Sequence, residues 1–113
     1  MKASTQAKLW YAQRISAMVL ALCVLVHLVT ILYAMRGGLS AAEILSRTRG
    51  NTVFALFYAL FVVSAVVHAP IGMARIAEEW LQWRGRSLTV ALLLVTLVLL
   101  ISGLRAVWSV YVS

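Results

Sequence analysis

Three long apolar segments, separated by short polar ones, account for most of the chain. They cover residues 15–35, 53–74 and 88–110, and few polar side chains interrupt them. A helix that crosses a lipid bilayer needs about 20 consecutive, mostly apolar residues. The pattern therefore predicts an all-α membrane protein with three transmembrane helices. Because the three spans fill most of the chain, we expect residues 1–113 to form a single domain.

The segment between the first two spans carries helix signals of its own. Gly37 and Gly38 come after Arg36, at the end of the first apolar segment, and glycine is the residue that most often ends a helix. Ser40 and Glu43 then have the spacing of a capping box, which begins a helix. We expect a short amphipathic helix that runs through about Ser46 and lies on the membrane surface.

The composition indicates that lipid, rather than water, surrounds most of this chain. Apolar residues make up 64% and charged residues only 12%, whereas a soluble domain carries about 25% charged residues. A disordered chain is excluded by this hydrophobicity, and 113 residues are too few to hide so much apolar surface. The single cysteine, Cys23, excludes an internal disulfide, and we expect it to pack as a small apolar residue.

The basic residues predict a membrane orientation rather than binding to nucleic acid. The formal charge is +7, but the charges lie at the ends of the apolar segments. Cytoplasmic segments carry an excess of Lys and Arg, so the larger group predicts a cytoplasmic N-terminus. The first apolar segment has 21 residues, more than the roughly 7–15 of a signal peptide, so we expect it to stay in the mature protein. The larger group is Lys2, Lys8, Arg14, Arg75, Arg84 and Arg86, and the smaller is Arg36, Arg47, Arg49 and Arg105.

Each of the first two spans contains one histidine, and an ionisable side chain at membrane depth indicates a functional site. His68, Gly72, Arg75 and Glu79 are spaced along one side of a helix, with Ser64 one turn earlier. This order suits a haem, because the imidazole binds iron, the glycine leaves room for the ring, and the arginine meets the propionates. The alternative is a packed helix interface, with the histidine bonded to a neighbouring helix.

Further polar side chains stand at the cytoplasmic entrance of the first span. Gln13, Arg14 and Ser16 could hold a haem propionate or a quinone carbonyl there. They could equally form a solvated helix end, and their spacing leaves both interpretations open.

Together these motifs resemble the membrane-anchor subunits of succinate dehydrogenase and fumarate reductase. The second span has the family's histidine, followed four residues later by glycine and then by an acidic and an aromatic residue. The first span begins with an Arg-x-Ser, and 54 residues separate this arginine from the histidine, which also fits the family. The resemblance covers essentially the whole chain. The residues that carry it are His68, Gly72, Glu79, Trp80, Arg14 and Ser16.

The resemblance implies a b-type haem with His68 as an axial ligand, and a ubiquinone or menaquinone site near the cytoplasmic surface. Arg14 and Ser16 match positions that line the quinone pocket and the haem propionates in the family. Glu79 replaces the usual Asp and keeps the carboxylate. Trp80 stands where one type of anchor carries a quinone-contacting Tyr, and its indole has an N–H donor but no phenol.

The resemblance also implies a respiratory complex in the bacterial inner membrane. Flavoprotein and iron–sulfur subunits would dock on the cytoplasmic face and carry out the dicarboxylate chemistry. A second anchor subunit, or a second copy of this chain, would supply the other haem ligand. The sequence itself shows no nucleotide-binding glycine loop and no set of iron–sulfur cysteines, so we do not expect the chain to be an enzyme alone.

His27 is a second histidine inside a span, in addition to the single haem ligand, His68, that the resemblance implies. It lies 13 residues after Arg14, and His68 lies 7 residues before Arg75. At 1.5 Å per residue, the two histidines are then roughly 20 Å and 10 Å below the same surface. One haem bridging both within this chain is awkward. His27 either binds a second haem, as in the five-helix single-chain anchors of the family, or forms a helix–helix hydrogen bond.

Two other functions remain open from the residues alone. A structural or assembly subunit needs no ligand at His68. A small transporter typically needs an acidic residue inside a span, and the three acidic residues of this chain, Glu43, Glu78 and Glu79, lie in loops or at helix ends.

Overall fold

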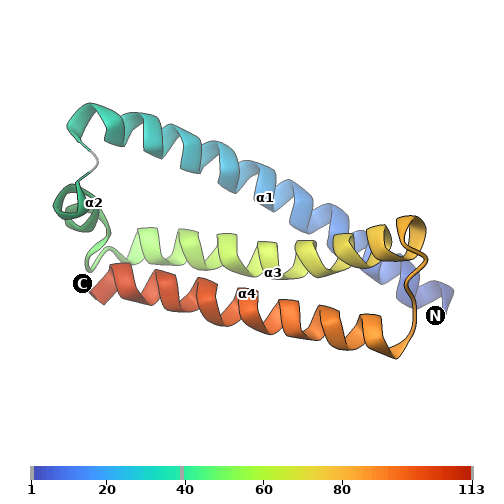
Figure 1. Cartoon of the computed structure of the whole chain (residues 1–113). Coiled ribbons are helices and arrows are strands. Elements are labelled where there is room, and N and C mark those ends of the chain that lie inside the picture. Colours follow the sequence, from blue (N-terminus) through green and yellow to red (C-terminus); the bar gives the residue numbers. More distant parts are fainter. Residues whose placement is uncertain (1, 39, 113) are drawn as a thin grey trace.

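The computed structural model describes residues 2–38 and 40–112, and within them the chain folds into four helices (Figure 1). Three of these are long and apolar enough to cross a membrane, and the fourth is short. The predicted fold of three spans and one loop helix is therefore confirmed. The helices are α1 (Ala3–Gly37), α2 (Ala41–Thr48), α3 (Thr52–Trp80) and α4 (Arg86–Val112).

The three long helices form an elongated antiparallel bundle with α3 in the middle. α3 packs against both α1 and α4, while α2 contacts the C-terminal end of α4. The bundle measures 50 × 23 × 23 Å, and the two ends of the chain lie at opposite ends of it (Figure 1). An odd number of spans requires this separation. The direction of insertion, with the N-terminus in the cytoplasm, stays a prediction.

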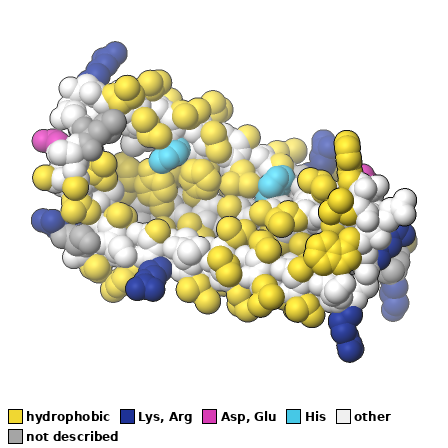
Figure 2. Space-filling view, viewed as in Figure 1, with side chains coloured by type: hydrophobic (Ala, Val, Ile, Leu, Met, Phe, Trp, Pro, Cys, Tyr) yellow, Lys and Arg dark blue, Asp and Glu magenta, His cyan; other side chains and the backbone are white. Residues whose placement is uncertain are grey.

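The burial pattern is the reverse of that in a water-soluble protein. Large apolar side chains are exposed along all three long helices, whereas the buried residues among those described are, apart from Leu88, small ones: Ser16, Cys23, Ser64 and Ala77. Figure 2 shows the same arrangement, with apolar side chains over the middle of the bundle and most of the visible Lys and Arg toward its ends. In lipid, small residues at helix interfaces let the backbones approach closely. The predicted burial of Cys23 is confirmed.

The helix boundaries extend beyond the predicted spans. α1 begins at Ala3, because the polar N-terminal segment continues the same helix, and α3 continues to Trp80 past the charged residues that follow the apolar segment. The loop helix ends at Thr48 rather than near Ser46. Its predicted N-cap is present, since Ser40 Oγ accepts a hydrogen bond from the Glu43 amide at 3.2 Å.

The first helix ends where the two glycines predict. α1 finishes at Gly37, and Gly38 has a φ of 99°, a conformation that only glycine adopts without strain. The chain then enters α2, whose C-terminal end is fixed to α4 by hydrogen bonds from Thr48 Oγ1 to the Val110 carbonyl and from the Gly50 amide to the Tyr111 carbonyl.

A glycine also sets the distance between α3 and α4. A methyl group placed on Gly103 would lie 2.6 Å from a Val62 side-chain carbon. The Val62 side chain therefore packs directly on the backbone of α4 at Gly103, where any larger residue would collide with it.

We expect Gly103→Leu to force the helices apart and to cost roughly 1–3 kcal/mol of stability. Thermal unfolding of the purified protein in detergent, followed by circular dichroism, measures this. Ala106→Leu is the matched control, because Ala106 is exposed on the same helix; equal midpoints for both variants would contradict the close contact.

Candidate functional site

The predicted row of polar residues on the second span is built on one uninterrupted helix. α3 begins at an Asn51 cap, whose Oδ1 accepts a hydrogen bond from the Phe54 amide at 3.1 Å, and it runs through Pro70 without a break. His68, Gly72 and Arg75 therefore share one side of α3, as their spacing predicts.

This side of α3 faces α1 at Gly72. A methyl group added there would lie 3.3 Å from Gln13 Nε2, so the Gln13 side chain of α1 covers the glycine. Within this chain, Gly72 thus permits a close contact between α1 and α3. The packed helix interface, the alternative to a haem site in the sequence analysis, is present at this residue. Ser16 and Ser64 are buried in the bundle, and Ser16 Oγ donates to the carbonyl of Gln13 in its own helix at 3.0 Å.

His68 lacks the hydrogen bond that a buried imidazole needs. Its Nδ1 atom is buried and has no hydrogen-bond partner among the described residues, and the same holds for Oε1 of Gln13. Gln13 packs on Gly72, one turn of α3 from His68. The α1–α3 interface thus holds two buried polar atoms without a partner, although burying such a group costs on the order of 1–3 kcal/mol.

His27, in contrast, has a partner on the neighbouring helix. Its Nδ1 and the Tyr58 hydroxyl oxygen lie 3.0 Å apart. The His27 ring also meets Tyr58 and Phe61 edge-on, at centroid distances of 5.6 and 5.8 Å. Phe54 and Phe57 pack on Tyr58 in turn. The helix–helix hydrogen bond, one of the two alternatives for His27, is present in the structure.

The same contacts fix the depth of the two histidines. Gln13 meets Gly72, and His27 meets Tyr58, so fourteen residues separate the two contacts on each helix and both fit one antiparallel register. His27 is therefore level with Tyr58, ten residues from His68 along α3, or about 15 Å. The sequence estimate of different depths agrees with this, and one haem cannot join both histidines of a single chain.

The remaining predicted residues do not converge on one place. The Arg14 guanidinium lies 5.1 Å from the centre of the Trp10 ring, and Arg14 is exposed on the outside of α1. Trp80 is 80% exposed at the end of α3. Arg75 and Glu79 instead line a pocket near the N-terminal end of α1, which includes neither Arg14, Ser16 nor Trp80.

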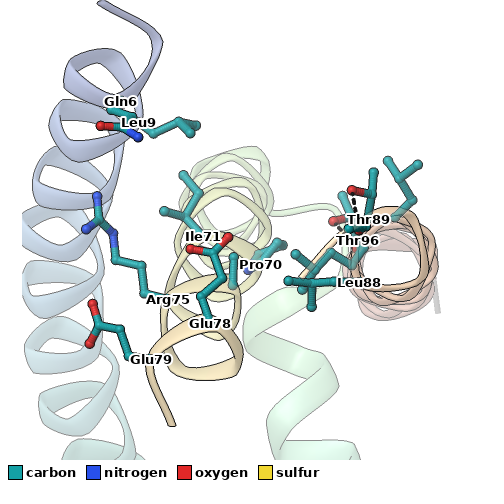
Figure 3. A pocket seen from close by; sticks show the side chains of 14 residues that line it. Gln6, Leu9, Pro70, Ile71, Arg75, Glu78, Glu79, Leu88, Thr89 and Thr96 are labelled. Atoms are coloured by element: carbon teal, nitrogen blue, oxygen red, sulfur yellow. Dashed lines mark hydrogen bonds between the residues drawn. The ribbon is translucent and has the colours of Figure 1, made fainter. Parts of the chain in front are cut away.

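That pocket is an open space of about 810 Å³ with walls from α1, α3 and α4. Figure 3 shows Gln6, Arg75 and Glu79 on the α1 side, Glu78 toward the middle of the pocket, and Leu88 with Thr89 and Thr96 on α4. Deeper along the helices the walls are mostly apolar, with Pro70, Leu92 and Leu93, and the hydroxyl of Thr96 donates to the carbonyl of Leu92. Small-molecule sites have this composition of apolar walls with a few convergent polar groups.

Two residues of these sites could not be found by sequence reasoning. Tyr58 lies in an apolar segment among three phenylalanines, and only the register between α1 and α3 brings it to His27. The sequence pattern places Glu78 only in a loop or at a helix end, and its position in the pocket depends on where α4 packs. In the described part of the chain, no three His, Cys, Asp or Glu side chains come together to hold a bare metal ion.

Residues 1–104 match the family described as succinate dehydrogenase/fumarate reductase transmembrane subunit. The chain belongs to this family. It is a multi-pass membrane protein, and its role is that of a membrane-anchor subunit in a complex of several subunits. No curated protein and no solved structure matches the chain. The resemblance drawn from the motifs of the first two spans is thereby confirmed at the level of the family.

The hydrogen bond between His27 and Tyr58 should stabilise the anchor subunit measurably. We expect Tyr58→Phe, which removes the hydroxyl and keeps the ring, to lower stability by about 0.6 kcal/mol, the average for such bonds in membrane proteins. A double-mutant cycle with His27→Ala, measured by unfolding in mixed detergent micelles, isolates the interaction. Tyr11→Phe is the control, since no hydrogen bond of the Tyr11 hydroxyl to a described residue is present. A coupling energy of zero would show that the bond contributes nothing.

Proposed function

We propose that this anchor subunit binds haem b through His68 and forms part of a quinone site, so that electrons pass between the iron–sulfur subunit and membrane quinone. The family supports the anchor role. The observation that carries the haem proposal is the contrast between the two histidines. His27 has its hydrogen bond within the chain, whereas His68 has none to any described residue.

The residues around His68 fit a haem by their chemistry. An imidazole nitrogen is a common axial ligand of haem iron, and a ligating histidine uses its other ring nitrogen for a hydrogen bond. The Oε1 atom of Gln13 is a free acceptor near it. Rotation of the Gln13 side chain would uncover Gly72 for the edge of a flat ring, and Arg75 offers positive charge toward the surface for a propionate.

Haem b supplies a one-electron relay inside the membrane when it is bound. The protein's part is to hold the iron through His68 at a fixed depth and to keep water away with the apolar helices. His27 lies about 15 Å farther along the bundle, so a second histidine that held the same haem would have to come from another chain. That chain is either a second anchor subunit or a second copy of this one.

The quinone head group, in this proposal, enters the pocket between α1, α3 and α4. A quinone joins a polar ring with two carbonyl oxygens to a long apolar tail. The pocket likewise has a polar part and an apolar part. Gln6, Arg75 and Glu79 lie at one end, and leucines and Pro70 form the walls. Ubiquinone and menaquinone both have this chemistry.

The proposed docking side for the catalytic subunits is the end of the bundle that holds the larger group of basic residues, where α1 begins, α3 ends and α4 begins. Arg14 and Trp80 are exposed there and free to contact another protein. The excess of basic residues at this end favours the cytoplasm, where flavoprotein and iron–sulfur subunits would carry out the dicarboxylate chemistry. The complex would then lie in the bacterial inner membrane.

The haem proposal is tested by the reduced-minus-oxidised visible spectrum of the purified complex, with a haem-to-protein ratio. We expect a bis-imidazole b-type signal in the wild type, its loss in His68→Ala, and its retention in His27→Ala. Separate partial losses in the two variants would instead indicate two haems. A wild-type complex without any haem would leave a structural or assembly subunit as the better account.

Two neighbouring leucines on α4 test the quinone pocket. Leu93 and Leu94 are both 58% exposed, but only Leu93 lines the pocket. Leu93→Trp should fill part of the space and raise the KM for quinone roughly tenfold, the effect of losing about 1.4 kcal/mol of binding. Leu94→Trp adds the same side chain outside the pocket and should leave KM unchanged. Equal KM values in the two variants would mean that quinone binds elsewhere.

A further inference from the structure

The two adjacent carboxylates at the end of α3 have different surroundings. Glu79 is exposed and lies with Arg75 on the α1 side of the pocket, on the same side of α3 as His68. Glu78 is half-buried and shares a different side of α3 with Ile71 and Ala74. Figure 3 shows its side chain in the pocket, with Arg75 on the α1 side and Leu88 of α4 on the other.

Glu78 has no partner that would hold its charge in place. No hydrogen bond or ion pair joins its carboxylate to another described residue. Ile71 and Ala74, which share its side of α3, are apolar, and the nearest cation of the pocket along the helix is Arg75, three residues earlier. Such a half-buried carboxylate is available to meet a ligand that enters the pocket. The pocket is an open one, so water can also reach the carboxylate.

From this placement we infer that Glu78, rather than Glu79, is the residue that exchanges a proton with quinone in the pocket. The inference rests on the proposed function, which supplies the quinone and, through the iron–sulfur subunit, the electrons. It concerns a residue that the motifs of the second span do not include.

The step balances as follows. Reduction of a quinone to a quinol adds two electrons and two protons. As the electrons arrive, the Glu78 carboxyl gives its proton to one quinone carbonyl oxygen and becomes a carboxylate, which takes a new proton from water at the open side. The second carbonyl oxygen receives its proton from water. In the opposite direction the Glu78 carboxylate accepts a proton from the quinol.

Few other charged groups face Glu78. Arg75 and Glu79 line the same pocket from α3, whereas the lining residues of α1 are Gln6 and Leu9 and those of α4 are uncharged. Arg75 is therefore the cation that can stabilise the carboxylate left after proton transfer. Glu79 is the competing proton donor, and the two must be separated by experiment.

The test compares Glu78→Gln, Glu78→Asp and Glu79→Gln in the intact complex. Quinone reduction is measured with a short-chain ubiquinone analogue as a function of pH, together with KM and the haem spectrum. Glu43→Gln is the control, because Glu43 lies on α2 at the opposite end of the bundle. We expect Glu78→Gln to lower kcat roughly a hundredfold, as loss of a general acid does, with KM and haem unchanged. Glu78→Asp should recover most of the rate.

Each other outcome overturns the assignment. A wild-type rate in Glu78→Gln, or a larger loss in Glu79→Gln, would remove Glu78 as the proton donor while the quinone site remained. Loss of haem or of assembly in Glu78→Gln without rescue by Glu78→Asp would show a structural role instead. A wild-type complex that does not reduce quinone at all would fail the proposed function itself, and the inference with it.

Discussion

Polar side chains buried between α1 and α3 need hydrogen-bond partners, and no water is there to supply them. The surroundings of both histidines follow from this constraint. Small residues such as Ser16 and Ser64 let the helices approach. Lipid offers no hydrogen bonds, so every polar side chain at this depth needs a partner from the protein or from a bound group. His27 finds Tyr58 on α3. His68 finds nothing among the described residues, and this asymmetry is the reason why we propose His68, rather than His27, as the haem ligand.

The antiparallel register of these two helices then decides what the chain can hold alone. Contacts between Gln13 and Gly72 and between His27 and Tyr58 fit the same alignment. The histidines consequently lie at different depths, and a haem with two imidazole ligands must span two chains. Under the haem proposal this chain would need a second chain to complete the site, and the family to which it belongs consists of transmembrane subunits of succinate dehydrogenase and fumarate reductase.

The pocket near the N-terminal ends of α1 and α4 shows how a bundle of apolar helices can form a site at the membrane border. α1 and α4 both pack on α3, and the space they leave near their N-terminal ends is lined by side chains of all three. Apolar walls continue into the bilayer, while Arg75, Glu78 and Glu79 end the pocket toward water. Adjacent residues on a helix point in different directions, so Glu78 and Glu79 have different neighbours despite being consecutive.

The sequence alone determined the features that depend on hydrophobic length and local signals. Three apolar segments predicted three spans, the two glycines after Arg36 predicted the end of α1, and Ser40 predicted the start of α2. The motifs of the first two spans, together with their order and spacing, were sufficient to indicate the family. Only the tertiary structure decided that Tyr58 bonds to His27, that Gln13 covers Gly72, that Arg14 points away from the polar row, and that Glu78 lies in the pocket. These depend on the rotation and register of one helix against another, which many small packing contacts set together and no local pattern specifies.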